Sequence, residues 1–219
     1  MHVALGDSAR RLDPLELARH GPVIPVIVIE RAEHALPMAR ALFDGGVRVL
    51  EVTMRTPAAL AAIAAIAQSI PDVIVGAGTV RSDADARAAL AAGARFAVSP
   101  GFSPRVAAAC REIGLALLPG VATASEVMLA ADHGFRFLKF FPAAAAGGLG
   151  VLKAWASVFA DVSFCPTGGI TAASAPDYLA LANVKVVGGS WLTPPDALAS
   201  ADWPRIERLA REAASLAPK

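Results

Sequence analysis

The segment D-H-G-F-R-F-L-K-F-F-P, Asp132–Pro142, contains the unit from which we predict the whole fold. Its glycine, Gly134, follows a helical pattern, and glycine suits the left-handed residue just past the end of a helix. The run that follows is short and is apolar on both sides of Lys139, as in a buried strand. The segment therefore predicts a helix that stops and a strand that begins at once.

The same plan recurs at Gly46, Gly93 and Gly114. Each glycine ends a helical stretch and precedes an apolar run, and each run is followed by residues that start helices. These start signals are Thr56-Pro57, Ser103-Pro104, Ser82 with Asp85, and Thr123 with Glu126. Strand and helix thus alternate with a period of about 20 to 26 residues, which is typical of βαβ crossovers.

Eight strands are predicted, and eight βα units in one chain favour a closed (β/α)8 TIM barrel in the α/β class over an open doubly wound sheet. The predicted strands are Val23–Ile29, Val47–Thr53, Val73–Ala77, Arg95–Ser99, Leu115–Leu118, Arg136–Phe141, Val162–Pro166 and Val184–Gly188. Helical patterns include Ala58–Gln68 and Ser125–Asp132. We expect an extra N-terminal helix at Asp13–His20 and a closing helix at Trp203–Ala217. Residues 1–219 then form a single domain, with an extension and helix over 1–20 and the C-terminal helix over 203–219.

Composition fits this organisation and excludes several classes of protein. The chain has 219 residues, of which 55% are hydrophobic and 18% charged, which is enough for one sizeable core. A net charge of +1 gives no electrostatic reason to expect nucleic acid or a membrane surface as a partner. Cys110 and Cys165 lack metal-ligand spacing, and the N-terminus has no apolar core of a signal peptide. We therefore expect two reduced thiols and a cytoplasmic protein.

Lys139 raises the question of function, because lysine is rarely buried without a partner. Side chains alternate along a strand, so Phe137, Lys139 and Phe141 share one face. Glu51 lies on one face of the second predicted strand, with Val49 and Thr53 on the same side. If both faces point inward, a carboxylate and an amine meet at the C-terminal ends of the strands, where barrels carry their active groups.

Two interpretations of this pair remain open at this point. The structural one is a buried ion pair between Glu51 and Lys139, or a lysine that reaches the surface on its long stem. The chemical one is an amine nucleophile, since an apolar surrounding disfavours the charged ammonium form. Glu51 would then transfer protons as a general acid and base.

Two glycine pairs end the last two predicted strands. Gly168 and Gly169 follow Thr167, and Gly188 and Gly189 precede Ser190. Glycine lets backbone N–H groups approach an anion, and the loops after strands 7 and 8 are the usual phosphate site of a barrel. A single pair would indicate only a tight turn, but two pairs at these positions favour phosphate binding.

Other candidates are weaker. Arg55 offers a fork for a carboxylate, or is a surface charge. Thr79 follows G-A-G at the end of the third strand, and Pro100 could form a wall of the site. The histidines His2, His20, His34 and His133 show no metal spacing, so no metal site is expected. Met54 and Met128 are expected to pack internally.

Seven segments run in an order that resembles a known family: L-E-V-T-M-R-T (50–56), V-G-A-G-T-V (75–80), V-S-P-G (98–101), L-P-G-V-A-T-A-S-E (118–126), F-R-F-L-K-F-F-P-A (135–143), F-C-P-T-G-G-I (164–170) and V-G-G-S-W-L (187–192). They are similar to those of the 2-keto-3-deoxy-6-phosphogluconate aldolases, which often also act on 4-hydroxy-2-oxoglutarate. The chain departs from that family in the alanines after Pro142 and in its N-terminal extension.

The resemblance implies a class I aldolase without metal or other cofactor, on a (β/α)8 barrel that is usually a homotrimer. By motif, Lys139 forms the Schiff base and Glu51 transfers protons. The substrate-binding residues implied are Arg55, Thr79, Pro100, Phe141, Thr167, Gly168, Gly169, Gly188, Gly189 and Ser190. The substrate is a phosphorylated keto acid, 2-dehydro-3-deoxy-6-phospho-D-gluconate, cleaved to pyruvate and D-glyceraldehyde 3-phosphate. Two alternative substrates remain open, the galactonate epimer and 4-hydroxy-2-oxoglutarate. Two alternative classes of protein also remain open, a barrel isomerase and a non-catalytic sugar-phosphate sensor.

Overall fold

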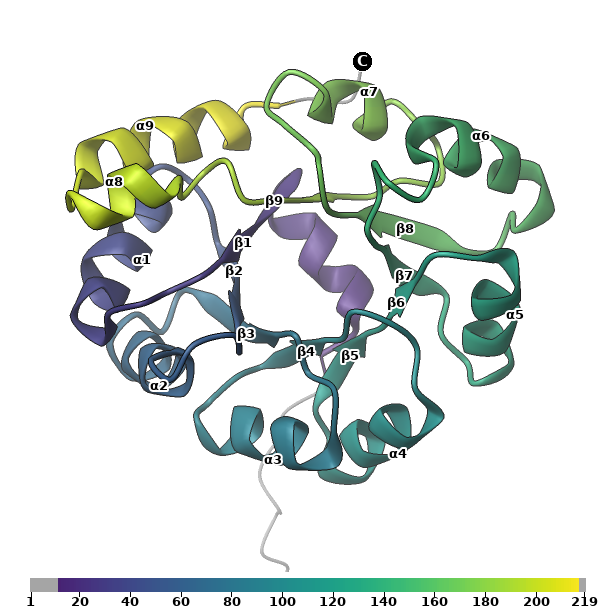
Figure 1. Cartoon of the computed structure of the whole chain (residues 1–219), viewed down its shortest axis with the longest axis horizontal. Coiled ribbons are helices and arrows are strands. Elements are labelled where there is room, and N and C mark those ends of the chain that lie inside the picture. Colours follow the sequence, from purple (N-terminus) through teal and green to yellow (C-terminus); the bar gives the residue numbers. More distant parts are fainter. Residues whose placement is uncertain (1–11, 217–219) are drawn as a thin grey trace, which may run out of the picture.

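The computed structural model describes residues 12–216. The predicted N-terminal extension before Leu12 and the last residues of the predicted C-terminal helix lie outside this range. Within it, strands and helices alternate and form a curled parallel sheet with its helices on the outside (Figure 1). This arrangement agrees with the α/β class that the glycine-punctuated repeat predicts.

The strands are short and almost entirely buried. They are β1 (Val23–Ile27), β2 (Val49–Thr53), β3 (Ile74–Gly78), β4 (Phe96–Val98), β5 (Ala116–Leu118), β6 (Gly120–Val121), β7 (Phe137–Phe140), β8 (Ser163–Pro166) and β9 (Val187–Gly189). The fifth predicted strand, Leu115–Leu118, corresponds to β5, whereas β6 was not predicted. Pro119 separates the two strands and has no N–H to donate to a ladder. Its carbonyl still accepts from Lys139 N, at 2.9 Å.

The ladders fall into two groups. Six strands pair in the order β5-β4-β3-β2-β1-β9, and three pair in the order β6-β7-β8. Two isolated bridges, Phe164 with Val184 and Thr167 with Gly188, link β8 to the segment of β9. The predicted eighth strand, Val184–Gly188, is therefore a bridge followed by a short strand. The sheet is curled and parallel, but its ladders do not form one unbroken ring of eight strands.

Helices surround the sheet in Figure 1. They are α1 (Ala35–Asp44), α2 (Ala59–Ser69), α3 (Asp83–Ala91), α4 (Pro104–Ile113), α5 (Ala124–Asp132), α6 (Gly148–Val158), α7 (Ala175–Leu179), α8 (Pro195–Ala199) and α9 (Trp203–Ala214), with 3-10 helices η1 (Pro14–His20) and η2 (Ala32–His34). Ser82, Ser103 and Thr123 are N-caps whose side chains accept from the backbone, as predicted. Thr123 and Glu126 form a reciprocal capping box.

The prediction for Thr56-Pro57 as a helix start is wrong. Helix α2 begins only at Ala59, with Ala58 as its N-cap residue. The Thr56 hydroxyl instead donates to the carbonyl oxygen of Ile29, just beyond β1. A threonine hydroxyl bonds a distant carbonyl as readily as a local N–H, and the sequence gives no sign of which partner is near.

The four predicted stop glycines all have positive φ. The values are 99° for Gly46, 90° for Gly93, 75° for Gly114 and 86° for Gly134. A side chain at this φ is strained, so the residue type and the turn require one another. Each stop returns the chain from an outer helix to the start of the next strand.

Two apolar layers lie on opposite sides of the sheet. The inner one gathers alternate strand residues, among them Val49, Ile74, Phe96 and Phe137, together with Leu17 of η1. The other packs the opposite strand faces, such as Leu138 and Phe140, against the helices. In Figure 1, η1 is the purple helix that crosses the middle of the ring of strands.

Two surface observations complete the fold. Met128 of α5, which we expected to pack internally, is 59% exposed, and its neighbour Leu129 is 42% exposed. Alanine-rich periodicity could not fix which face of this helix meets the sheet. Among residues 12–216, no helix combines the length and apolar character needed to cross a membrane.

Candidate active site

Lys139 and Glu51 both point into the interior of the curled sheet. Lys139 follows Phe137 by two residues in β7, and Phe137 belongs to the inner apolar layer. Glu51 follows Val49 by two residues in β2, and Val49 belongs to the same layer. The alternation along each strand therefore brings the carboxylate and the amine to one side of the sheet, as the sequence predicts.

The two groups form a buried ion pair. Lys139 Nζ donates to Glu51 Oε1 at 3.0 Å and lies 3.4 Å from Oε2. The Lys139 side chain is 5% exposed and that of Glu51 is 4% exposed. Lys139 therefore does not reach bulk water on its stem, so the alternative of a surface lysine is excluded. An amine held beside a carboxylate in a dry interior is suited to a reaction that needs a nucleophile and a proton carrier.

Phe141 provides one aromatic side of this site. The Nζ of Lys139 lies 5.3 Å from the centroid of the Phe141 ring, on its face. The same ring lies close to Gly168, where an added Cβ would be 3.3 Å from two ring carbons. Phe141 thus connects the lysine to the first of the two glycine pairs.

Arg55 and Thr79 lie together just past the ends of β2 and β3. Arg55 Nε donates to Thr79 Oγ1 at 3.2 Å. Thr79 has a φ of 63°, which is unusual for a β-branched residue and marks a strained position. The hydrogen bond from Arg55 keeps the Thr79 hydroxyl next to the guanidinium, and both groups can contact a carboxylate or carbonyl.

The two glycine pairs meet where β8 and β9 end. Thr167 and Gly188 form a parallel bridge. Gly168 and Gly169 have positive φ, at 98° and 75°. In the part of the chain that the structure describes, the N–H groups of Gly168, Gly169 and Ser190 donate to no protein atom. Free backbone N–H groups from two adjacent loops are suited to an anion.

Steric contacts explain why positions 188 and 189 are both glycine. An added Cβ at Gly188 would lie 2.1 Å from Thr167 Oγ1, and one at Gly189 would lie 1.9 Å from the Trp191 ring. Gly188 therefore lets Thr167 stay buried beside it, and Gly189 lets Trp191 fold back. Ser190 follows as an exposed residue.

Pro100 lies on a different wall. An added Cβ at Gly120 would lie 2.4 Å from the Pro100 carbonyl carbon and 2.4 Å from its oxygen, so the loop after β4 packs against the start of β6. Since β6 pairs with β7 and Gly120 is in register with Lys139, this loop lies one strand away from the amine. Within residues 12–216, no hydrogen bond joins Pro100 to Lys139 or Glu51.

Gly78 is a residue of this site that the sequence analysis missed. It ends β3 opposite Thr53 of β2, and the atoms nearest to its missing side chain belong to Glu51. The available signal was the spacing of the G-A-G segment, which puts Gly76 and Gly78 on one face of a strand. A glycine on the inner face of a strand indicates a close approach by a neighbouring group.

The residues at this site favour neither metal nor thiol chemistry. Among the described residues, no three His, Cys, Asp or Glu side chains lie together as a metal site would need. The Cys165 thiol is 3.8 Å from Thr167 Oγ1 and buried, and burial raises its pKa to about 12. Cys165 is therefore a core thiol.

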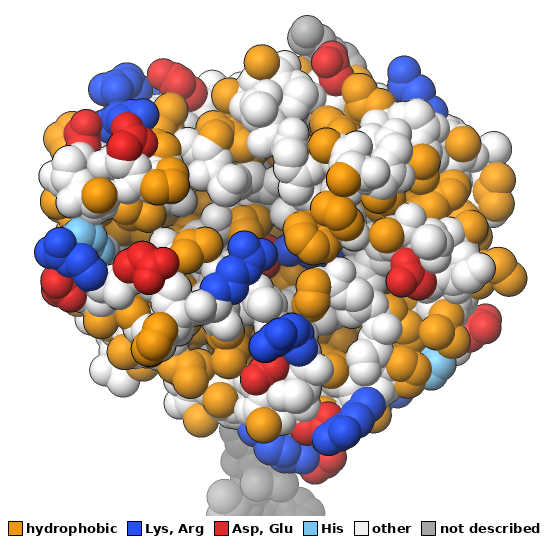
Figure 2. Space-filling view, in the orientation of Figure 1, with side chains coloured by type: hydrophobic (Ala, Val, Ile, Leu, Met, Phe, Trp, Pro, Cys, Tyr) orange, Lys and Arg blue, Asp and Glu red, His pale blue; other side chains and the backbone are white. Residues whose placement is uncertain are grey.

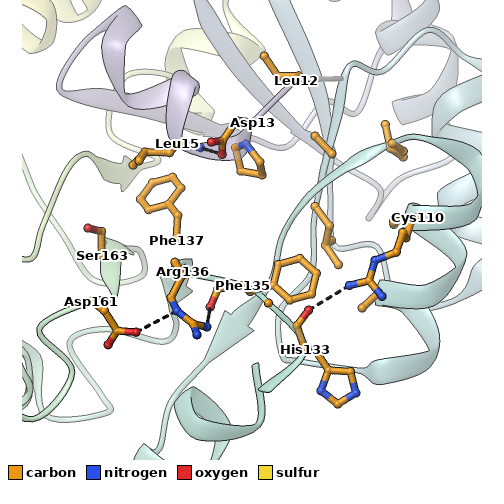
Figure 3. A pocket seen from close by; sticks show the side chains of 17 residues that line it. Leu12, Asp13, Leu15, Cys110, His133, Phe135, Arg136, Phe137, Asp161 and Ser163 are labelled. Carbon is orange, nitrogen blue, oxygen red and sulfur yellow. Dashed lines mark hydrogen bonds and ion pairs between the residues drawn. The ribbon is translucent and has the colours of Figure 1, made fainter. Parts of the chain in front are cut away.

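Two cavities are lined by neither Lys139 nor Glu51. One of about 490 Å³ lies between β1 and α8, and Val26, Val28 and Ser190 line part of it. The other, of about 380 Å³, lies at the opposite end of the strands, beside η1 (Figure 3). Its charged side chains are already engaged, since Arg136 Nε lies 2.9 Å from Asp161 and Arg111 donates to the His133 carbonyl.

In Figure 2, Lys and Arg side chains lie near the middle of the face shown, with apolar side chains around them.

Comparison with known proteins gives a consistent result. A family model described as "Aldolase: KDPG and KHG aldolase" matches residues 15–209. The 2-dehydro-3-deoxy-phosphogluconate aldolase of Dickeya dadantii is 55% identical over 193 residues, which are 88% of this chain and 91% of that protein. The KHG/KDPG aldolase of Escherichia coli K12 is 54% identical over 193 residues, again 88% and 91% of the two chains.

A solved structure matches closely as well. It is KDPG aldolase from Legionella pneumophila with pyruvate captured at low pH as a covalent carbinolamine intermediate. It has a TM-score of 0.91 and 46% sequence identity, and the match covers 93% of this chain and 99% of that chain. The Legionella protein thus forms a covalent adduct with a keto acid on the same fold.

Proposed function

This chain belongs to the KDPG and KHG aldolase family, and we propose that it cleaves 2-dehydro-3-deoxy-6-phospho-D-gluconate through a Schiff base on Lys139. It is a carbon–carbon lyase, and its products are pyruvate and D-glyceraldehyde 3-phosphate. The observation that carries the residue assignment is the buried pair of Lys139 and Glu51, at 3.0 Å. The relatives that act on KHG support a second substrate, 4-hydroxy-2-oxoglutarate, which gives pyruvate and glyoxylate.

Substrate binding begins with its two charged ends. The phosphate accepts hydrogen bonds from the free N–H groups of Gly168, Gly169 and Ser190 and from the Ser190 hydroxyl. Arg55 and Thr79 hold the carboxylate end. Anchoring both ends fixes the keto carbon near Lys139, and such orientation lowers the barrier by several kcal/mol in well-positioned reactions, roughly 7 to 11 at the most favourable.

Lys139 is the nucleophile of the covalent step. Its neutral amine attacks the C2 keto carbon and gives a carbinolamine, which loses water to form an iminium ion. The covalent carbinolamine in the Legionella structure supports this order of events. Glu51, 3.0 Å away, accepts the proton that the ammonium must lose and returns one to the departing hydroxyl.

Cleavage follows from the iminium ion. Glu51 takes the proton of the C4 hydroxyl as the C3–C4 bond breaks, and the bonding electrons move into the iminium to give an enamine. D-glyceraldehyde 3-phosphate leaves. Glu51 then returns the proton to C3 of the enamine, and water hydrolyses the resulting iminium to release pyruvate and restore Lys139. The Phe141 ring, whose centroid lies 5.3 Å from Nζ, stabilises the cation through its face during these steps.

We propose further that the curled sheet is a (β/α)8 barrel and that the chain is one domain. The sequential order of β1 to β5, with β1 between β2 and β9, supports closure over an open doubly wound sheet. Exposed Met128 and Leu129 on α5 offer an apolar contact for a homotrimer, which light scattering would test. No metal or cofactor is required by these steps, and a cytoplasmic location fits two reduced thiols.

Borohydride trapping tests the central assignment. The protein is incubated with pyruvate, reduced with borohydride, digested and analysed by peptide mass spectrometry. We expect a pyruvyl adduct on Lys139 that is absent from Lys139→Ala. No adduct, under conditions that trap a known lysine aldolase, would overturn the Schiff-base assignment. Comparing turnover of the phosphorylated gluconate, its galactonate epimer and 4-hydroxy-2-oxoglutarate then identifies the preferred substrate.

A further inference from the structure

We propose that Gly78 is a positioning residue for Glu51. Its missing side chain leaves the space in which Glu51 holds Oε1 against Lys139. The inference rests on the aldolase function proposed above and adds to it a residue that makes no contact with substrate.

The space beside Gly78 is filled by one residue. A Cβ at Gly78 would lie 2.4 Å from Glu51 Oε1, 2.8 Å from its Cγ and 3.0 Å from its Cδ. Carbon and oxygen atoms that are not bonded do not approach to 2.4 Å, so the carboxylate would have to move. These are the three heavy atoms nearest to the added carbon, and all of them belong to Glu51.

The oxygen that would be displaced is the one that faces the amine. Oε1 accepts from Lys139 Nζ at 3.0 Å, whereas Oε2 lies 3.4 Å from it. Gly78 and Lys139 therefore approach the same oxygen. Any shift of Oε1 away from Gly78 changes its distance or direction to the reacting nitrogen.

Gly76, two residues earlier in β3, likewise leaves space for a neighbouring side chain, in this case an apolar one. Its added Cβ would lie 2.4 Å from the ring of Phe96, which fills the inner layer below the ion pair. Strand β3 thus presents two glycines on its inner face. Gly76 leaves room for an aromatic ring from β4, and Gly78 leaves room for a carboxylate from β2.

The backbone gives no other reason for glycine at position 78. Gly78 is not among the glycines with positive φ, so an alanine can adopt its conformation. The effect of Gly78→Ala is then the effect of one methyl group beside Glu51. This makes the substitution a direct test of position.

The test separates proton transfer from Schiff-base formation. In D2O, an aldolase of this kind exchanges the methyl protons of pyruvate through the enamine, which proton NMR follows. We expect Gly78→Ala to slow this exchange by about 10- to 100-fold, because a misplaced general base loses rate steeply with distance. The yield of borohydride-trapped pyruvate on Lys139, after equilibration, should stay within about twofold of wild type, since Lys139 itself is untouched.

A double-mutant cycle excludes a merely structural effect. In the Glu51→Gln background, adding Gly78→Ala should change the exchange rate by less than about twofold, since the group it displaces no longer transfers protons. An equal loss in both backgrounds would overturn the inference, and so would wild-type exchange in Gly78→Ala or loss of its trapped adduct. Gly150→Ala is the matched control, because Gly150 is exposed on α6 and has open space around it.

Folding provides a second test. If Gly78→Ala alone does not fold, the comparison is made in the Glu51→Ala background, where adding Gly78→Ala should cause no further loss of stability, because the atoms that the methyl group meets have been removed. A further loss of stability in Glu51→Ala/Gly78→Ala relative to Glu51→Ala would place the constraint elsewhere and overturn the inference. Failure of the wild-type protein to trap pyruvate would instead refute the proposed function, so the two failures are distinguishable.

Discussion

Lys139 Nζ lies 3.0 Å from Glu51 Oε1, although 88 residues separate the two side chains in the sequence. Both are almost fully buried, so each is the principal counter-charge of the other. Removing one partner of a buried ion pair leaves an unpaired charge in a dry interior, which destabilises a protein by about 3 to 5 kcal/mol. Chemistry and stability are therefore coupled at this pair, and each substitution has to be judged by both.

For Glu51→Gln we expect turnover to fall by about 10²- to 10⁴-fold, the usual contribution of a positioned general acid and base. The amide keeps the shape of the side chain but cannot accept a proton. Released pyruvate is measured by coupled reduction with lactate dehydrogenase. Glu212→Gln, at an exposed position of α9, is the control and should leave turnover unchanged. Full activity in Glu51→Gln would remove this residue from the mechanism.

For Lys139→Met we expect no turnover and a loss of stability of about 3 to 5 kcal/mol, because the Glu51 carboxylate stays buried without its partner. The double variant Lys139→Met/Glu51→Gln should recover most of that stability while remaining inactive. Urea unfolding at neutral pH measures both. Equal stability of the single and double variants would show that the carboxylate finds another partner.

For Thr79→Gly we expect opposite effects on stability and binding. Glycine relieves the strain of a φ of 63°, so the free energy of unfolding should not fall and should rise by up to about 1 kcal/mol. Loss of the hydroxyl that accepts from Arg55 should raise KM. Ala201→Gly is the control, since Ala201 has a φ of 55° outside the site and should gain stability without any change in KM. Unchanged KM in Thr79→Gly would assign the threonine a structural role alone.

For Ser190→Ala we expect KM for the phosphorylated substrate to rise about tenfold, the value of one hydrogen bond to a charged group. The backbone N–H of residue 190 remains, so binding is weakened rather than lost. The KM for 4-hydroxy-2-oxoglutarate, which carries no phosphate, should not change. A parallel rise in both KM values would place Ser190 away from the phosphate.

For the thiols we expect no reaction with Ellman's reagent in the folded protein at pH 8. Burial raises the pKa of Cys110 to about 11 and that of Cys165 to about 12. A raised pKa means that deprotonation requires a higher pH in the folded chain than in the unfolded one, so at most about one thiol in a thousand is thiolate at pH 8. Both cysteines should react after denaturation in urea. Rapid reaction of the folded protein would show an opening motion that exposes one of them.

The order of the elements could be predicted from the sequence because its signals are local. Gly46, Gly93, Gly114 and Gly134 end helices through their own positive φ. The alternation Phe137, Leu138, Lys139, Phe140 predicts which side chains share a face, and the two apolar layers confirm it. Such signals need no knowledge of distant residues.

The wrong or missing predictions concern residues whose environment is decided by distant parts of the chain. Thr56 bonds the carbonyl of Ile29 in place of capping α2, and Met128 lies on the exposed side of α5. The role of Gly78 depends on Glu51 of the neighbouring strand, whose side chain lies beside it. In each case the deciding partner comes from another element.

The sequence by itself determined the alternation of strand and helix, the inward faces of β2 and β7, and the candidate residues for aldolase chemistry. Only the tertiary structure decided that Lys139 meets Glu51 at hydrogen-bond distance, that β6 follows β5 beyond Pro119, and that Gly78 makes room for the carboxylate. The physical reason is the distance along the chain between the residues that decide each feature. Strand alternation and glycine conformation are set by neighbouring residues, whereas the distance between two side chains on different strands is set by the register and curl of the whole sheet.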